Sequence, residues 1–312
     1  MNILLWHVHG SWTTAFVQGR HRYLLPVLPD HGPDGRGRAQ TWEWPDSAVA
    51  VTPAEAAEAE VDAVVLQRPA ELHGLAERWL GGRRPGSDVP AVYVEHNAPQ
   101  GRICAMRHPA ADRRDLLLVH VTHFNDLFWD GGVTRTRVIE HGVVDPGPLY
   151  TGELPRAAVV INEPRRRGRV TGTDLLPRLN GDVPLDLFGM DAAALGGIEN
   201  PPQAELHAQM ARRRVYLHPI RWTSLGLSLI EAMQLGMPVV ALATTEAPDA
   251  VPPVAGVTST NVAVLAAAVR RLVAEPDEAR ERGRLARAWA LERYGLRRFL
   301  DDWDRTFEEV TA

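Results

Sequence analysis

Residues 215–242, VYLHPIRWTSLGLSLIEAMQLGMPVVAL, decide the fold of this 312-residue chain. The apolar start at 215–218 predicts a buried β-strand, and a loop with a glycine-containing turn at Gly226 follows it. The residues after the turn predict a helix, which Gly236 ends before a second apolar strand at 238–242. A strand, a helix and a strand in this order are typical of a parallel α/β sheet.

The start of that helix has the features of an anion-binding site. Gly226 lets the backbone approach a ligand closely, and Ser228 is a candidate cap for the helix. The amide groups of Leu227 and Ser228 then face the ligand with the positive end of the helix dipole behind them, which favours phosphate. Glu231, one turn further, can accept hydrogen bonds from ribose hydroxyls. A strand–glycine–helix turn alone is more often structural than functional, so this interpretation depends on the rest of the chain.

The same alternation of strands and helices runs through the whole chain. In the first half it predicts strands at 2–8, 62–66, 90–95, 116–121 and 136–140, and helices at 16–28 and 70–80. In the second half it adds strands at 157–161 and 184–189 and helices at 173–179 and 203–213. The prolines and glycines at 145–152 predict a domain boundary. We therefore expect a first domain at 1–150, a second at 151–290, and a terminal helical segment at 291–312.

The composition excludes several classes of protein. With 45% hydrophobic and 23% charged residues, the chain is that of a globular protein. A net charge of −5 gives no general attraction to nucleic acid, and no apolar run reaches the ~20 residues that a transmembrane helix needs. The single cysteine, Cys104, excludes a disulfide framework and suits a reducing compartment, so we expect a cytoplasmic protein. Every strong base is arginine, whose planar guanidinium suits bidentate phosphate contacts.

The 215–242 stretch resembles the donor-binding signature of the family-4 glycosyltransferases of the GT-B fold. The resemblance runs through Gly226-Leu227, Glu231-Ala232-Met233 and Gly236-Met237-Pro238-Val239-Val240. Residues 138–145 (VIEHGVVD) and 172–176 (GTDLL) are similar to two further segments of that family, in the same order. The resemblance implies an α/β fold of two Rossmann-like domains with an interdomain cleft, in which the second domain binds most of the donor nucleotide. It also implies that the last helix packs back on the first domain.

By this resemblance Glu231 holds the ribose of the donor. The family has another glutamate upstream, and its place is taken here by Thr223, so Thr223 and Ser224 fall in the pocket for the donor sugar. Two interpretations follow: either a hydroxyl makes a weaker contact in an altered sugar pocket, or the capacity to bind the donor has decayed. The intact glycine turn and Glu231 favour the first.

The resemblance also assigns basic side chains upstream of the glycine turn to the donor diphosphate. The family's lysine is replaced by Thr171, but an arginine run at 165–169 (RRRGR) precedes it on the loop after a strand. We select Arg166 and Arg169 as phosphate ligands, although an arginine run is by default a solvated surface.

In the first domain the resemblance marks two more residues. Gly10, in the first strand–helix turn, takes the place of a glycine that faces the donor phosphates. His96, at the end of a strand, matches the family's active-site histidine and is the candidate catalytic residue. A histidine at such a place is as often structural as functional.

Together these residues predict a glycosyltransferase that moves a sugar from a UDP-, GDP- or dTDP-linked donor to an acceptor that the sequence does not name. The resemblance implies retention of the anomeric configuration, and we expect no cofactor and, because a strand followed by Asp-x-Asp is absent, no metal. The only Asp-x-Asp sequence, Asp302-Trp303-Asp304, has no strand before it, so we interpret it as a solvated helix face. A nucleotide-sugar epimerase on the same fold and a non-catalytic partner protein related to this family are the alternatives.

Overall fold

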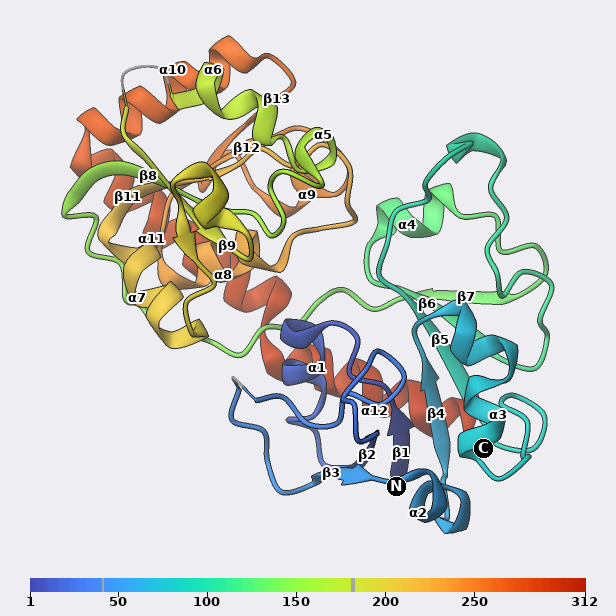
Figure 1. The fold of residues 1–312 in the computed structure, drawn as a ribbon. Helices are drawn as coiled ribbons and strands as arrows, with labels where there is room; N and C mark the ends of the chain where they lie inside the picture. The colour runs from blue at the N-terminus through green and yellow to red at the C-terminus, as the bar shows by residue number, and fades with distance from the viewer. Residues whose placement is uncertain (41, 181–182) are drawn as a thin grey trace. The chain divides into compact units, whose positions relative to one another are not determined.

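A computed structural model describes residues 1–40, 42–180 and 183–312 (Figure 1). The chain divides into two compact units. The N-terminal unit holds Met1–Gly142 together with Leu296–Ala312, and the C-terminal unit holds Val143–Gly295. The division after Gly142 lies before the boundary expected at 150, because Val143 pairs with Gly295 and the N–H of Tyr150 donates to the carbonyl of Leu235.

The N-terminal unit is built on a seven-stranded parallel sheet in the order β3-β2-β1-β4-β5-β6-β7. Its strands are β1 (Asn2–Leu5), β2 (Arg22–Pro26), β3 (Ala48–Val51), β4 (Ala63–Leu66), β5 (Ala91–Glu95), β6 (Leu117–His120) and β7 (Arg135–Val138). The segments between them hold α1 (Gly10–Phe16), α2 (Pro53–Glu58), η1 (Glu71–Leu75), α3 (Ala76–Trp79), η2 (Ile103–Ala105) and α4 (His123–Phe128). Every residue of β4 and β5 is buried, as expected for a parallel sheet that is covered on both faces.

The helix predicted at 16–28 is wrong. Helix α1 ends at Phe16, and the apolar residues Tyr23, Leu24 and Leu25 belong to β2, where they are almost fully buried. A short apolar run fits a helix and a buried strand equally well, and only the pairing of β2 with β1 and β3 decides between them.

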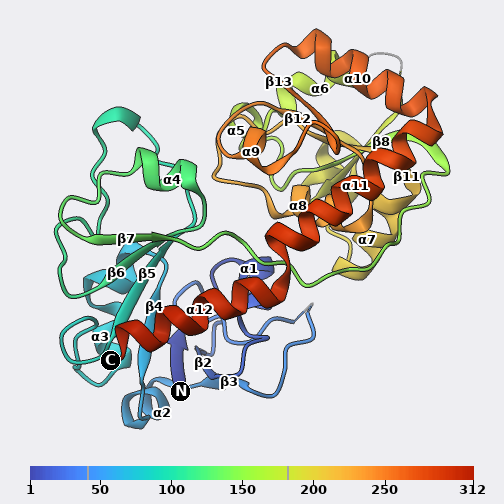
Figure 2. The same ribbon diagram turned by 180° about the vertical axis from the view of Figure 1, so that it is seen from behind.

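Helix α12 (Leu296–Val310) belongs to the N-terminal unit although it is the last helix of the chain (Figure 2). It carries the buried aromatic residues Phe299, Trp303 and Phe307. Trp303 meets Trp12 and Phe16 of α1 edge-on, with ring centroids 5.8 and 5.0 Å apart. This aromatic packing attaches the end of the chain to the first helix of the unit.

The C-terminal unit is built on a six-stranded parallel sheet in the order β10-β9-β8-β11-β12-β13. Its strands are β8 (Leu154–Val160), β9 (Leu185–Gly189), β10 (Ile198–Glu199), β11 (Arg213–His218), β12 (Val239–Leu242) and β13 (Gly256–Ser259). Its helices are α5 (Gly168–Thr171), η3 (Thr173–Leu175), α6 (Leu176–Asn180), η4 (Ala192–Leu195), α7 (Gln203–Arg212), α8 (Leu227–Leu235), α9 (Ala247–Ala250), α10 (Val262–Ala274) and α11 (Pro276–Tyr294). The elements predicted between 157 and 242 are all present, and β10 and β13 are additional.

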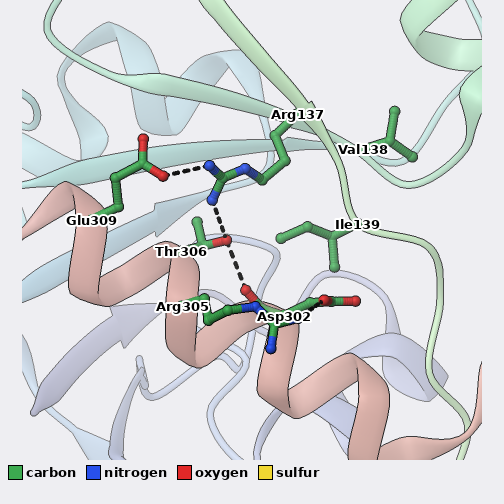
Figure 3. Close-up of a pocket in the computed structure, with 7 residues that line it drawn as sticks. All are labelled: Arg137, Val138, Ile139, Asp302, Arg305, Thr306 and Glu309. Carbon is green, nitrogen blue, oxygen red and sulfur yellow. Dashed lines mark hydrogen bonds and ion pairs between the residues drawn. The ribbon is translucent and has the colours of Figure 1, made fainter.

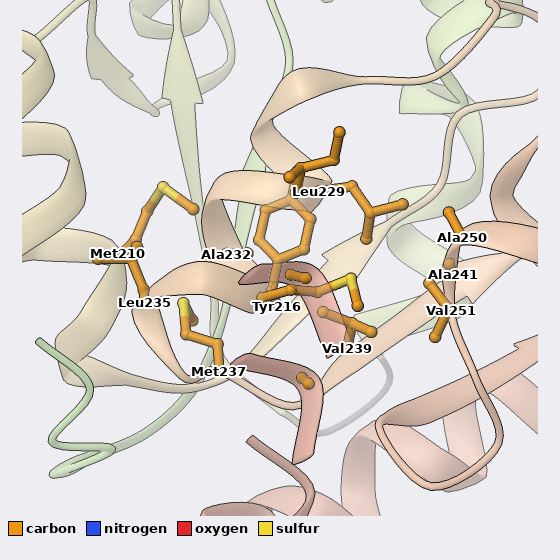
Figure 4. Packing of buried hydrophobic residues seen from close by; sticks show 14 of the residues in the cluster. Met210, Tyr216, Leu229, Ala232, Leu235, Met237, Val239, Ala241, Ala250 and Val251 are labelled. Carbon is orange, nitrogen blue, oxygen red and sulfur yellow. The ribbon is translucent and has the colours of Figure 1, made fainter. Parts of the chain in front are cut away.

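Helix α8 lies in the core of the C-terminal unit (Figure 4). Its residues from Leu229 to Leu235 are all buried. The apolar residues among them share one hydrophobic cluster with Tyr216 of β11 and Val239 of β12, both 0% exposed. Because protein interiors are closely packed, a charged side chain on this helix is held in a defined position.

The strand order of each sheet reverses at one place, and ligands of open α/β sheets usually bind at the carboxyl ends of the strands there. In the C-terminal unit this place lies between β8 and β11, and in the N-terminal unit it lies between β1 and β4. In each unit, the segments that follow these strands therefore contain the candidate functional residues.

Candidate functional site

In the C-terminal unit, the segments after β8 and β11 are held against each other. The backbone N–H of Arg221 donates to the carbonyl of Val170 at 2.9 Å, and its Nη2 donates to Oδ2 of Asp174 at 3.0 Å. Gly172 has a φ of +74°, and a Cβ there would lie 1.9 Å from the carbonyl oxygen of Pro219, so only glycine fits. These contacts bring the arginine run close to the loop that precedes α8.

Helix α8 begins without a side-chain cap. Gly226 is its N-cap residue, and the cap forms no side-chain hydrogen bond. The prediction that Ser228 caps the helix is therefore wrong: Ser228 lies inside the first turn, and its Oγ accepts a hydrogen bond from the Tyr216 hydroxyl at 2.9 Å. Because the first N–H groups of a helix have no partner within it, those of Leu227 and Ser228 point out of its start.

A neighbouring side chain requires Gly226 to be glycine. A Cβ at this position would lie 2.6 Å from Cε1 of His218, which is 3% exposed. Burial lowers the pKa of His218 to about 4, so its ring is neutral at pH 7. The ring therefore supports the helix start without adding a charge to it.

Glu231 is a buried carboxylate with a single ionic neighbour. It is 4% exposed, and its Oε2 lies 3.5 Å from Nε2 of His207 on α7. Within the described parts of the chain no other residue forms a hydrogen bond or an ion pair with this carboxylate. Since a buried carboxylate is stable only when it accepts hydrogen bonds, the unused capacity of Glu231 suits the hydroxyl groups of a ligand.

The two arginines selected from the sequence both have carboxylate partners. Nε of Arg166 donates to Oε1 of Glu163 at 2.7 Å, and this bond raises the pKa of Arg166 and lowers the pKa of Glu163. Nη1 of Arg169 lies 3.4 Å from Oδ2 of Asp174. Their side chains are 68% and 81% exposed, so a phosphate would have to replace a solvated ion pair at either one.

Arg167 is one of the two arginines of the run that the sequence did not single out. It is the N-cap residue of α5 and is half-buried. No acceptor in residues 1–40, 42–180 or 183–312 takes a hydrogen bond from its guanidinium, whereas Arg165 donates from Nη2 to the carbonyl of Ala194 at 2.6 Å. Because its charge is unpaired, Arg167 joins the candidates for binding an anion.

Thr223 and Ser224 lie in the loop before α8, in the region expected for the donor sugar. The Oγ1 of Thr223 is buried and has no hydrogen-bond partner in the described structure. Ser224 is 4% exposed. Since buried hydroxyl groups nearly always have a partner, the Thr223 oxygen is a candidate ligand contact.

In the N-terminal unit, the segments after β1, β4 and β5 bring aromatic and polar side chains together around His96. This residue directly follows β5, is 7% exposed, and has its Nε2 3.0 Å from Oε1 of Gln67, which follows β4. Its ring lies against His9 with centroids 4.2 Å apart and meets Trp12 edge-on at 4.9 Å. Gln67 was missed in the sequence because a single glutamine after a strand belongs to no motif.

Burial keeps the three histidines of this region, His9, His96 and His141, neutral. It lowers the pKa of His96 well below the usual value, and the neighbouring His9 and His141 lower it further. Burial also lowers the pKa of His9 to about 4 and that of His141 to about 3. This histidine cluster is uncharged at pH 7, so it suits hydroxyl groups better than phosphate.

Gly10 begins α1 beside the histidine cluster. A Cβ at this position would lie 3.6 Å from Nε1 of Trp42, an ordinary van der Waals distance. Packing therefore does not require glycine here, and the contact of Gly10 with donor phosphates stays a prediction.

A separate pocket of the N-terminal unit lies between β7 and α12 (Figure 3). Its volume is ≈ 290 Å³, and it is lined by Arg137, Val138, Ile139, Asp302, Arg305, Thr306 and Glu309. Its charged side chains pair with one another, Arg137 with Glu309 and Arg305 with Asp302.

Both carboxylates of the Asp-x-Asp sequence have ionic partners. Asp302 pairs with Arg305, and Asp304 lies 2.9 Å from Nε of Arg20. The described residues contain no group of three or more His, Cys, Asp or Glu side chains placed to hold a metal ion.

The chain is similar to known proteins in part of its sequence and in its fold. Residues 190–275, which include α8 and Glu231, match the family model for glycosyl transferases group 1. Sucrose-phosphate synthase of Thermosynechococcus elongatus has a similar structure, with a TM-score of 0.74, 13% identity and 99% of both chains covered. HepE of Anabaena, in complex with UDP and glucose, gives a TM-score of 0.70 at 15% identity and covers 99% of this chain and 100% of its own. A search of curated protein sequences finds no significant match.

This chain has the GT-B glycosyltransferase fold. The resemblance predicted from the sequence is confirmed, and so are the two α/β units with parallel sheets. The family model that matches residues 190–275 is one of glycosyltransferases, the class that the sequence predicted. In the described part of this GT-B chain, no helix is both long enough and apolar enough to cross a membrane.

Proposed function

We propose that this protein transfers a sugar from a nucleoside-diphosphate sugar to an acceptor hydroxyl, with retention of the anomeric configuration. The observation that carries the proposal is Glu231, a buried carboxylate with unused acceptor capacity, one turn inside a helix that begins without a cap. This carboxylate would accept hydrogen bonds from the ribose hydroxyls. UDP is the nucleotide to test first, because structures of HepE hold UDP and UDP-glucose.

The diphosphate would bind at the start of α8. The N–H groups of Leu227 and Ser228 and the unpaired guanidinium of Arg167 supply positive charge there, with Arg166 and Arg169 available if their ion pairs open. When the donor bond breaks, negative charge grows on the departing diphosphate, and preorganised donors of this kind stabilise it. We therefore propose that the protein needs no divalent ion, because these groups supply the charge that such an ion would provide.

The chemical step exchanges one bond at the anomeric carbon for another. The bond from this carbon to the diphosphate oxygen breaks while the acceptor oxygen bonds to the carbon on the same face. The acceptor proton passes to the departing phosphate oxygen. Thr223 and Ser224 would contact the donor sugar, and His96, in its neutral surroundings, would contact a sugar or acceptor hydroxyl.

Nucleotide binding is the first experiment. The full chain is titrated with UDP, GDP, dTDP and ADP in thermal-shift and calorimetric measurements, alone and as sugar conjugates. We expect UDP to raise the melting temperature of the wild-type protein and to have little effect on Glu231→Ala. No stabilisation by any nucleotide would contradict the proposal and favour a non-catalytic partner protein.

Product analysis then separates the two enzymatic alternatives. A transferase releases UDP and passes the sugar to an added acceptor or, slowly, to water. An epimerase yields a new nucleotide sugar without any acceptor, and that product would contradict transfer. The cytoplasmic location, the cleft between the domains and the absence of a cofactor stay predictions.

A further inference from the structure

The buried contacts of Gln67 determine where the proton of His96 lies. Gln67 is 4% exposed, and its Nε2 donates to the carbonyl oxygen of Trp6, directly after β1, at 2.7 Å. Because a carbonyl oxygen can only accept a hydrogen bond, this contact fixes the orientation of the amide. The amide nitrogen faces Trp6, and the amide oxygen faces His96.

The amide oxygen in turn fixes the tautomer of the imidazole. Oε1 of Gln67 can only accept, so Nε2 of His96, 3.0 Å away, carries a hydrogen. Burial keeps the ring neutral, and a neutral imidazole has a hydrogen on only one nitrogen. The lone pair of His96 is therefore on Nδ1.

The backbone of Gln67 is itself fixed by the buried carboxyl group of Glu71, which pairs with the partly exposed Arg68. The N–H of Gln67 donates to Oε2 of Glu71 at 2.6 Å, and Oε1 of Glu71, which is 0% exposed, accepts from Nε of Arg68 at 2.6 Å. The backbone of Gln67 is thus held at the end of β4, and its side chain is held by the carbonyl of Trp6 at the end of β1. The strand order of the sheet reverses between these two strands. This arrangement leaves the amide of Gln67 little freedom to turn.

We propose that Gln67 is a positioning residue that fixes His96 as the Nε2–H tautomer, with the lone pair of the ring on Nδ1. The inference rests on the proposed function for the role of His96 in catalysis. A neutral ring with a defined tautomer has one fixed donor and one fixed acceptor nitrogen, and it brings no positive charge to a phosphate.

The tautomer can be measured directly on the full chain. Long-range ¹H–¹⁵N NMR of ¹⁵N-labelled protein distinguishes a protonated from an unprotonated ring nitrogen, and the loss of signals in His96→Gln assigns His96. We expect a hydrogen on Nε2 and none on Nδ1 throughout the range of about pH 6 to 8, where a buried neutral histidine does not titrate. A hydrogen on Nδ1 in the wild-type protein would overturn the proposal.

Two substitutions connect the tautomer to turnover, followed as release of UDP from the donor. Gln67→Leu removes the acceptor, so we expect the Nδ1–H tautomer to appear and kcat to fall roughly tenfold, about the value of one hydrogen bond, with the Kd for UDP unchanged. Gln67→Glu keeps an acceptor for Nε2–H, so the tautomer stays. Its negative charge favours the imidazolium, so the acidic limb of the kcat profile moves to higher pH.

Gln18→Leu is the matched control, since Gln18 is a half-buried glutamine of the same unit whose Nε2 donates to the carbonyl of Thr14 at 3.2 Å. We expect it to leave the tautomer and kcat unchanged. If His96→Ala loses activity, an unchanged kcat in Gln67→Leu would overturn the proposal. Full activity of His96→Ala would instead reject the role of His96 in the proposed function, while the tautomer of the wild-type protein would still decide on Gln67.

Discussion

The carboxyl edges of the two sheets differ in charge although the sheets share one architecture. The edge of the C-terminal unit carries an acidic side chain, Glu231, and a basic one, Arg167, together with the N–H groups at the start of α8. The edge of the N-terminal unit carries the neutral rings of the histidine cluster. A charged ligand is stabilised at the edge of the C-terminal unit. At the edge of the N-terminal unit it would lose its hydration without gaining a group of opposite charge. The fold thus determines where a ligand binds, and the side chains after the strands determine which charge it carries.

The largest effect should come from the neutral edge. In His96→Ala we expect kcat to fall roughly 100-fold, the scale of losing a hydrogen bond that acts in the transition state, while the Kd for UDP stays within about twofold. Steady-state kinetics of UDP release and calorimetry with UDP measure the two quantities. A similar loss in both would show that the neutral edge also binds the nucleotide.

The charged edge should show the opposite pattern. In Glu231→Gln we expect the Kd for UDP to rise about 10- to 100-fold, because a hydrogen bond to a charged group contributes ~1.5–3 kcal/mol. Glu278→Gln, on α11 and paired with Arg282 at 2.7 Å, is the control and should bind UDP like the wild-type protein. Unchanged UDP affinity in Glu231→Gln would remove the assigned role of this carboxylate.

A smaller change in the Kd for UDP should distinguish Arg167 from Arg166. We expect Arg167→Ala to raise the Kd for UDP about tenfold, as for one charge-assisted hydrogen bond, and Arg166→Ala to raise it less, because Glu163 already occupies Arg166. Calorimetry on both variants in the same buffer measures the difference. A larger effect of Arg166→Ala would mean that the ion pair opens when the nucleotide binds.

The smallest expected difference between the two units is in how much their free energy of unfolding falls at acidic pH. Burial lowers the pKa of His9 and His120 to about 4 and that of His141 to about 3 in the N-terminal unit, and that of His218 to about 4 in the C-terminal unit. Between the unfolded value of 6.5 and these folded values, only the unfolded chain takes up protons. The free energy of unfolding therefore falls as the pH falls through this window, by up to ~1.4 kcal/mol per pH unit for each such histidine.

Calorimetry at about pH 7 and 5 tests this expectation, since both values lie above the folded-state pKa of a buried neutral histidine. UDP identifies the transition of the C-terminal unit because a ligand raises the melting temperature of the unit that binds it. We expect acid to lower the melting temperature of the N-terminal unit more. Equal shifts of the two transitions would contradict the difference between the two regions.

The local structure of the candidate site in the C-terminal unit was largely predictable because its features lie close together in the sequence. Gly226, the start of α8 and Glu231 lie within a few residues of one another, and the glycine, the apolar helix and the following strand each leave a signature at short range. The N-terminal unit was harder to predict. The residues of β2 were assigned to a helix, because their pairing with β1 and β3 is not written in their own sequence.

Periodicity and one continuous motif in the sequence predicted the alternating strands and helices, the two-part chain and the helix that carries Glu231. The resemblance to a known family implied the GT-B fold. The tertiary structure alone decided which arginine lacks a carboxylate, which histidine lies beside Glu231, and which nitrogen of His96 carries the proton. These properties depend on burial and on hydrogen-bond partners from distant segments. The contact of Gln67 with Trp6 joins residues 61 positions apart, a distance that no local pattern encodes.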